Sequence, residues 1–392
     1  MFADPPIDPV ALAHHYRAFA QPGRVLLTGH SHQAWPDVAR AAVLEAFDDA
    51  AAHVDDKWTR AAAKADAMRA AIGRATGARP ADLALAPNTH ELVTRFLSAL
   101  DWSKRRHVVT TDGEFHSLRR QLARLEETGV EVTWVPAAPV STLAERLAAA
   151  VRPDTAALMA STVLFRTAAV VPHLRAAVEA AQRVGAEVLL DAYHAFMTVP
   201  FHLADLGPDP IFVVAGGYKY AQWGEGCCWM RVPPDCALRP IDTGWFAEFA
   251  TLAEAPPGKV PYGRAGAERF AGSTYDPTSH YRAAAVAAFF DHHGLTVHRL
   301  RQQSLLQTQR LIEALPDLRL LTPEAPAERG GFVAFEVPDA GHVVEHLRRR
   351  GIFVDARGDV LRLGPAPYVD DDALDAAADH VRAVVRENAA SN

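Results

Sequence analysis

The sequence predicts an α/β protein in which a large domain with a mostly parallel sheet precedes a smaller α+β C-terminal domain. Short apolar runs alternate with helical stretches from about residue 83 to 231, prolines and a glycine interrupt the chain near residue 257, and a different order of elements follows. The strand runs are apolar on both faces, as in parallel strands covered by helices on each side. We therefore expect an N-terminal arm at 1–50 that joins the small domain, a large domain at 51–255 and the small domain at 256–392.

The segment before the sheet is mostly helical. A short helix is expected near Val10–Ala20, then a short strand at Val25–Leu27. An Ala-rich helical pattern covers Asp37–Thr76, and Gly77 and Pro80 end it.

The large domain supplies seven strand candidates, with helices such as Ser117–Thr128 and Val171–Val184 between most of them. The strand candidates are Leu83–Leu85, His107–Thr111, Val130–Val135, Thr155–Ala160, Glu187–Asp191, Ile211–Ala215 and Cys227–Arg231. In the small domain we expect, in order, helices at Ser279–His292 and Thr296–Leu315, a strand near Gly331–Val337, a helix at Ala340–Gly351, a strand at Val360–Leu363 and a helix at Asp371–Glu387.

Composition argues against several classes of function. A net charge of −7 and a pI near 6.2 give no support for binding to nucleic acid or to an anionic membrane. No apolar segment has the length of a membrane span, and the N-terminus lacks the basic and apolar parts of a signal peptide. Three cysteines cannot form a disulfide framework, so we expect a cytoplasmic location.

An acidic residue and a lysine lie at the ends of two predicted strands. Asp191 ends one strand, and Lys219, 28 positions later, follows Ile211–Ala215. Open α/β sheets bind ligands beyond the carboxyl ends of their strands. This layout suits pyridoxal 5'-phosphate (PLP), because the lysine amine can condense with the cofactor aldehyde while the carboxylate keeps the ring nitrogen protonated. Singly, Asp191 would be interpreted as a turn-capping carboxylate and Lys219 as a solvated lysine.

Further residues fit the same interpretation. His194 could hydrogen-bond the cofactor's phenolic oxygen or its phosphate. Burial beside a pyridinium should lower the pKa of Lys219, which would allow it to act as a general base. Phe115 could stack on the pyridine ring or belong to the core, and His30 is expected to reach the active site.

The phosphate needs a separate binding site. Asn88 and Thr89 lie where a predicted strand turns into a helix, and a helix N-terminus offers free N–H groups and the positive end of the dipole. An ordinary helix N-cap is the alternative interpretation. Tyr218 and Trp245 are further phosphate candidates, through a hydroxyl and an indole N–H.

Several motifs resemble those of fold-type I PLP enzymes of the class V aminotransferase group, and within that group those of kynureninases. The resemblance covers about residues 25–368. Its motifs are Leu27–Ser31, Glu114–Ser117, Phe165–Thr167, Asp191–Ala195, Tyr218–Tyr220 with Gly224–Gly226, Gly244–Phe246 and Leu361–Tyr368.

The resemblance implies a role for each predicted site residue. Lys219 would be the catalytic residue and Arg362 would bind the substrate α-carboxylate. His30, Ser31 and Arg166 are the other substrate-binding candidates. The implied cofactor-binding residues are Asn88, Thr89, Phe115, Ser117, Asp191, His194, Tyr218, Lys219, Trp245, Ser273 and Thr274. The last two would bind phosphate from the neighbouring subunit, so a homodimer with shared active sites is expected.

The reaction implied is hydrolytic cleavage of the Cβ–Cγ bond of L-kynurenine or a related amino acid, as in tryptophan catabolism. Lys219 would remove the α-proton, water would add to the side-chain carbonyl, and L-alanine and an aromatic acid would leave. The chain departs from the kynureninase pattern at Phe246–Glu248 and at Gly272–Pro277. Both departures fall where the substrate side chain would be recognised, which leaves the substrate open.

Two alternatives remain. One is another class V PLP enzyme: an aminotransferase, an epimerase or a β-lyase. Cysteine desulfuration is disfavoured because no cysteine follows Cys236. The other is a binding or regulatory module that kept the fold, against which the intact Asp191, His194 and Lys219 argue. The scattered histidines have no cysteine or carboxylate at ligand spacing, so no metal site is expected.

Overall fold

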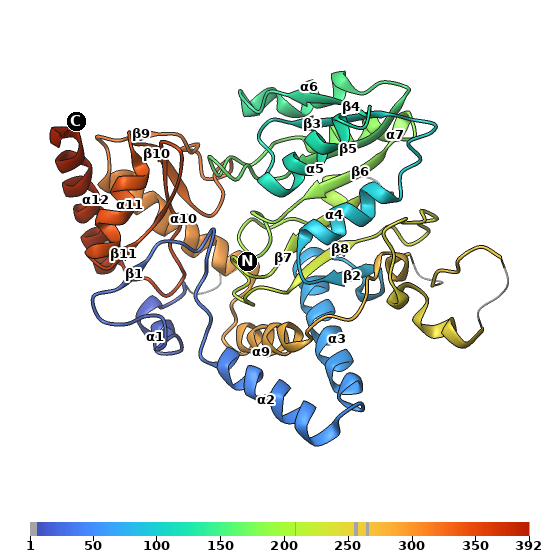
Figure 1. Cartoon of the computed structure of the whole chain (residues 1–392). Coiled ribbons are helices and arrows are strands. Elements are labelled where there is room, and N and C mark those ends of the chain that lie inside the picture. The colour runs from blue at the N-terminus through green and yellow to red at the C-terminus, as the bar shows by residue number, and fades with distance from the viewer. Residues whose placement is uncertain (1–5, 208, 255–257, 264–265, 392) are drawn as a thin grey trace.

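A seven-stranded sheet forms the centre of the larger part of the molecule (Figure 1). The computed structural model describes residues 6–207, 209–254, 258–263 and 266–391. The strand order is β2 (Leu83–Ala86), β8 (Cys228–Arg231), β7 (Phe212–Gly216), β6 (Glu187–Asp191), β5 (Thr155–Ser161), β3 (His107–Thr111) and β4 (Glu131–Val135). β8 runs in the opposite direction to the other six strands of this sheet. The predicted α/β class with a mostly parallel sheet is confirmed, and each of the seven strands lies within a residue of its predicted bounds.

Helices cover both faces of this sheet because neighbouring residues of each strand enter different cores. In β6, Leu189 packs in a core with α4 (Thr89–Ser98) and α5 (His116–Glu126), whereas Leu190 packs in one with α6 (Leu143–Ala150) and α7 (Leu174–Arg183). Buried parallel strands with apolar residues on both faces produce this double coverage. Short helices occupy the connections: α8 (Leu203–Leu206), η1 (Pro80–Asp82), η2 (Val140–Thr142), η3 (Trp245–Glu254) and η4 (Ala267–Phe270).

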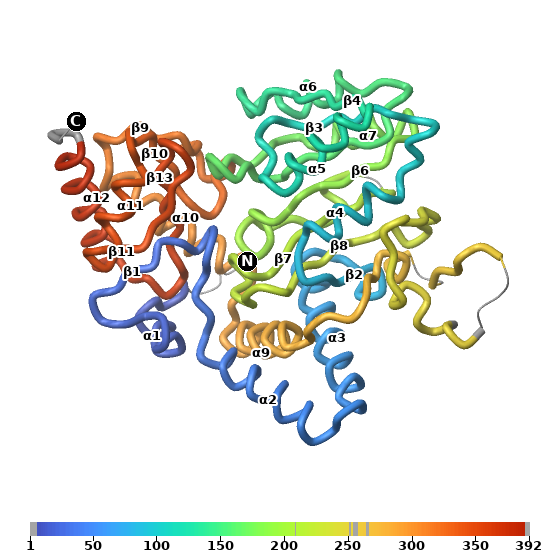
Figure 2. Tube along the Cα trace, viewed as in Figure 1, coloured from blue at the N-terminus to red at the C-terminus, as the bar shows by residue number. Residues whose placement is uncertain are grey.

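The N-terminal segment joins the two parts of the molecule. After α1 (Pro9–Ala13), β1 (Val25–Leu26) pairs in parallel with β11 (Ile352–Phe353), and Figure 2 shows the N-terminal trace running beside the C-terminal elements. The stretch predicted as helical at Asp37–Thr76 is helical except for a break that was not predicted, which divides it into α2 (Val38–His53) and α3 (Lys57–Thr76). The break is at Val54, whose φ of 50° no helix can contain and which the Ala-rich pattern does not signal.

The C-terminal part is a smaller α+β unit, as predicted. The long α9 (Thr278–His292) packs on α2 and α3 and leads into α10 (Val297–Ala314). A four-stranded antiparallel sheet follows in the order β12 (Asp355–Arg357), β13 (Val360–Leu363), β10 (Val333–Glu336) and β9 (Arg319–Leu320), together with α11 (Ala340–Arg349) and α12 (Asp371–Ser391). The predicted domain boundary between residues 255 and 256 lies outside the described residues, as do residues 1–5 of the arm.

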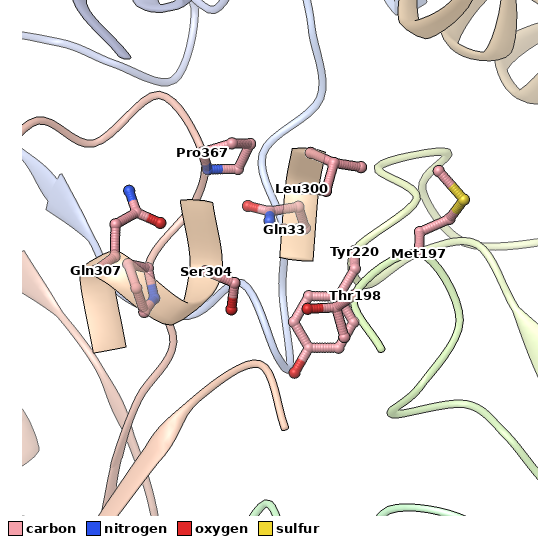
Figure 3. Close-up of a pocket in the computed structure, with 9 residues that line it drawn as sticks. Gln33, Met197, Thr198, Tyr220, Leu300, Ser304, Gln307 and Pro367 are labelled. Carbon is pink, nitrogen blue, oxygen red and sulfur yellow. The ribbon is translucent and has the colours of Figure 1, made fainter. Parts of the chain in front are cut away.

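A small cavity of about 20 Å³ lies where the N-terminal segment, α10 and the loop after β7 meet (Figure 3). Gln33, Tyr220 and Ser304 are among its lining residues, and the buried Tyr220 hydroxyl and Ser304 Oγ have no hydrogen-bond partner in the part of the chain that the structure describes. A space of this size with polar walls suits one water molecule.

Among the described helices, none has the length and apolar composition needed to cross a bilayer.

Candidate active site

A cavity of about 250 Å³ lies at the carboxyl ends of β5 and β6 and against the loop that follows β7. The sheet order places these ends side by side, so residues far apart in the sequence meet there. Eight of the predicted site residues line this cavity: Asn88, Thr89, Phe115, Ser117, Asp191, His194, Tyr218 and Lys219.

Lys219 is the most buried cation of this cavity, with 4% of its surface exposed. Its Nζ lies 2.7 Å from Nε2 of His194 and 4.5 Å from the centre of the Tyr193 ring. Burial lowers the pKa of Lys219 to about 7, the charge of Asp191 opposes this shift, and the charge of Arg362 adds to it. A substantial fraction of the amine is therefore neutral near pH 7, as a nucleophile or a general base requires.

Asp191 ends β6 and lies opposite Ser161 in the β5–β6 register. Its Oδ1 accepts a hydrogen bond of 2.8 Å from the backbone N–H of Tyr193. Burial raises the pKa of Asp191, against the opposing effects of this hydrogen bond and of Lys219. A buried carboxylate with so little compensation is stabilised by a cation brought into the cavity, such as a protonated ring nitrogen.

His194 occupies the inner wall between Lys219 and the small domain. Burial, together with the charges of Lys219 and Arg362, holds the pKa of His194 well below its ordinary value, so the imidazole is neutral. Its Nδ1 is buried and has no hydrogen-bond partner among the described residues. A bound ligand with a donor or acceptor at that position would satisfy it.

The first turn of α4 forms another part of the cavity wall. Asn88 is the N-cap, and its side chain accepts a hydrogen bond of 2.9 Å from the backbone N–H of Glu91. The ordinary-cap interpretation therefore holds for the Asn88 side chain, while Thr89 lines the cavity at the positive end of the helix dipole.

Phe115, which precedes α5, contacts Phe165 edge to face, with 5.4 Å between the ring centres.

Arg362 and His30 lie outside this cavity, in a buried network whose third member, Asp355, was not predicted from the sequence. Its Nε and Nη2 donate to the two carboxylate oxygens of Asp355, at 2.8 and 2.6 Å, and Nε2 of His30 lies 2.9 Å from Oδ1 of the same carboxylate. Burial alone would raise the pKa of Asp355, but His30 and Arg362 outweigh it and hold this pKa well below its usual range. Burial also lowers the pKa of His30 to about 4.

A sequence signal for Asp355 was available. Asp355 and Arg362 are cross-strand partners in β12 and β13, which a two-residue Gly358-Asp359 turn connects. Gly-Asp between two short β-prone runs is a hairpin signal, and counting outward from that turn pairs residue 355 with residue 362.

The structure does not bring the remaining predicted residues into the cavity of this chain. Ser31 is buried beside His30, and its Oγ donates to the Thr28 carbonyl at 3.3 Å. Arg166, Trp245, Ser273 and Thr274 are exposed. Among the described residues, no group of three or more His, Cys, Asp and Glu side chains is arranged to hold a metal ion.

Glu114 is a second buried acid that the sequence analysis named only as part of a motif. Its two oxygens accept hydrogen bonds from Ser161, at 2.9 Å from the backbone N–H and 2.6 Å from the hydroxyl. Burial raises the pKa of Glu114 to about 8, although these hydrogen bonds oppose the shift. The pair ties the segment carrying Phe115 to the end of β5, and thereby fixes one wall of the cavity.

These residues fit PLP. Lys219 offers an amine that is partly neutral near pH 7, and the start of α4 offers an anion site in the same cavity. Among the described residues, Asp191 forms no ion pair and Nδ1 of His194 has no hydrogen-bond partner. The arrangement can therefore hold an aldehyde, a ring nitrogen and a phosphate at separate positions.

Comparison with known proteins supports this interpretation. Residues 300–381 match the family model of the kynureninase C-terminal domain. The kynureninase of Deinococcus radiodurans is 28% identical over 96% of this chain and 94% of its own length. The uncharacterized aminotransferase YcbU of Bacillus subtilis is 24% identical over 88% of this chain and 90% of its own length.

Solved structures share the fold. The cystine C–S lyase C-DES, in complex with its reaction product cysteine persulfide, superposes with a TM-score of 0.81 at 18% identity, covering 93% of this chain and 98% of that chain. Together the comparisons indicate a class V PLP-dependent enzyme that resembles kynureninase, with pyridoxal 5'-phosphate as its cofactor.

Proposed function

We propose that this protein is a kynureninase-like hydrolase, which cleaves the Cβ–Cγ bond of L-kynurenine or a related amino acid to L-alanine and an aromatic acid. The observation that carries the proposal is the cavity itself, which the buried Lys219 lines together with Asp191 and in which its Nζ contacts His194. The likeness to kynureninases, along nearly the whole chain and in the C-terminal domain model, favours this reaction among those of class V enzymes.

The roles proposed for the side chains follow from their places. When PLP is bound, it supplies an electron-withdrawing ring that acidifies the substrate Cα–H. Lys219 removes this proton, and its low pKa keeps the amine basic yet unprotonated near neutral pH. Asp191 would pair with the ring nitrogen, Thr89 and the start of α4 would hold the phosphate, and Phe115 would cover one ring face, since all of these residues line the cavity.

We propose further that the enzyme is a homodimer in which each subunit completes the site of the other. Three predicted cofactor-binding residues, Trp245, Ser273 and Thr274, are exposed and outside the cavity of their own chain. A second copy packed over that face would bury them against its own cavity. The free thiols of Cys227, Cys228 and Cys236 suit the cytoplasmic location that we propose for it.

The reaction is tested by incubating the PLP-loaded protein with L-kynurenine and with 3-hydroxy-L-kynurenine. Stoichiometric formation of L-alanine and the matching aromatic acid is expected. A matched reaction with Lys219→Ala controls for uncatalysed breakdown. No alanine from either substrate would refute the hydrolase proposal.

Transamination is the second candidate, favoured by the similarity to the aminotransferase YcbU along most of the chain. It predicts that an amino donor together with a keto acid yields a new amino acid and a new keto acid, without carbon–carbon cleavage. Formation of a keto acid in place of alanine would select this candidate.

A further inference from the structure

Three of the five N–H groups of Arg362 are already used within the protein. The Asp355 carboxylate accepts hydrogen bonds from Nε and Nη2, and the Phe165 carbonyl accepts one from Nη1 at 2.6 Å. A guanidinium carries five N–H donors in one plane, so two donors remain. One of them is on Nη1 and the other on Nη2, and we call these two donors the free fork of Arg362, which a second carboxylate can still engage.

This fork lies next to the active-site cavity. Phe165, whose carbonyl Arg362 contacts, lines that cavity. The Phe332 ring packs between the two sites, 5.5 Å from the Arg362 guanidinium and 5.7 Å from the His194 ring. An amino acid held at Lys219 can therefore direct its carboxylate toward the two free donors.

Asp355 is itself held from two sides. It is the cross-strand neighbour of Arg362, and His30 reaches it from the N-terminal segment, 325 positions away in the sequence. The His30 ring is fully buried and stacks on Phe332 at 4.5 Å. Only 2% of the Arg362 side chain and 15% of the Asp355 side chain are exposed, so neither can turn freely into solvent.

We propose that Asp355, held by His30, is a positioning residue that fixes Arg362 with its free fork toward the cavity, where it binds the α-carboxylate of an amino-acid substrate. This deepens the proposed function and rests on it only in assuming an amino-acid ligand at Lys219. A free arginine side chain loses much rotamer entropy when it binds an anion, and fixing it beforehand removes that cost. Asp355 also neutralises the guanidinium between turnovers, so that it is not a buried unpaired charge.

The test uses the PLP-loaded protein and two small amines. L-Alanine and ethylamine differ in the α-carboxylate, and each is titrated while the visible absorption of the bound cofactor is recorded. The variant is Asp355→Asn, which keeps the shape but offers one acceptor oxygen in place of two. Asp359→Asn is the matched control, since it makes the same charge change at an exposed site of the same hairpin.

For Asp355→Asn we expect the apparent dissociation constant of L-alanine to rise about tenfold or more, while that of ethylamine stays unchanged. Asp359→Asn should match the wild type for both amines. If Asp355→Asn does not retain PLP, His30→Phe serves instead, because it removes the donor to Asp355 and keeps an aromatic ring against Phe332. It should weaken L-alanine binding alone, by a smaller factor.

Unchanged L-alanine binding in the variants would overturn the proposal, and so would an equal loss for both amines. A wild type that does not distinguish L-alanine from ethylamine would also overturn it. The titration requires no turnover of kynurenine, so a failure of the hydrolase proposal leaves this test intact.

Discussion

The cavity around Lys219 and the network around Arg362 are adjacent buried polar sites with opposite electrostatics. In the cavity, Lys219, Asp191 and His194 all have pKa values displaced by burial toward their neutral forms. In the network, Asp355 stays ionised because two buried partners hydrogen-bond it. The polar side chains of the cavity are incompletely paired, whereas those of the network already make most of their hydrogen bonds and ion pairs without a ligand.

This difference separates chemistry from positioning. Groups left incompletely paired in a buried site can exchange protons or accept a cofactor, and such groups cluster at reactive centres. Groups that hydrogen-bond each other fully are held rigid, and they fix the orientation of neighbouring side chains. Changes in the cavity should therefore abolish catalysis or cofactor attachment, and changes in the network should weaken substrate binding.

The largest effect is expected for Lys219→Ala. It removes the amine that attaches PLP and accepts the substrate proton, so activity should fall by about a thousandfold or more. After borohydride reduction and denaturation, the wild type should retain the cofactor on the polypeptide and the variant should not. Lys104→Ala, which removes an exposed lysine of the same domain, is the control. If the variant kept the cofactor covalently bound, an amine other than that of Lys219 would be the attachment site.

Arg362→Ala should have the next largest effect and a different character. Loss of a charged hydrogen-bonding pair to the substrate should raise KM by about 30- to 100-fold, with a smaller change in kcat. The visible absorption of the bound cofactor should persist, which also reports an intact fold. Arg348→Ala, at an exposed position of α11, should leave KM unchanged. If PLP is lost instead, the assignment of Arg362 to the substrate is wrong.

The cavity could be predicted from the sequence because topology alone assembles it. Asp191 ends a strand, Lys219 follows the next strand, and Thr89 begins a helix after another, so a parallel sheet brings them to one edge. No single position was sufficient, but the pairing of Asp191 with Lys219 at strand ends was, and the strand bounds were correct to within a residue.

The network was found only in part, because its residues meet through long-range pairing. His30 was predicted from its place after a strand and Arg362 from motif resemblance, but neither signal includes their shared partner Asp355. The break at Val54 was missed for a related reason, since a helix end that depends on one positive φ has no compositional signal. Burial of Glu114 against Ser161 likewise depends on how the β3–α5 loop meets β5.

The pH dependence of stability should distinguish the two sites in the cofactor-free protein. The pKa of Lys219 is lowered to about 7 in the folded state, from an ordinary value near 10.5. Between these values the unfolded chain binds more protons, so the free energy of unfolding should rise with pH through this window. Below about 7 the lysine is charged in both states and its full cost remains, and above about 10.5 that cost vanishes.

Asp355 differs from Lys219 in its pH window and in the sign of its contribution: its charged form stabilises the folded state, whereas the charged form of Lys219 destabilises it. Because the folded pKa of Asp355 is depressed, it contributes stability above its ordinary pKa, near 4, and that contribution is lost as the pH falls below it.

Urea unfolding of the cofactor-free wild type and of Lys219→Met at pH 7 to 10 measures the cavity contribution as a difference. That difference should move in favour of the wild type by a few kcal/mol as the pH rises. A difference independent of pH would show that Lys219 titrates alike in the folded and unfolded chains, and the contrast between the two sites would fail.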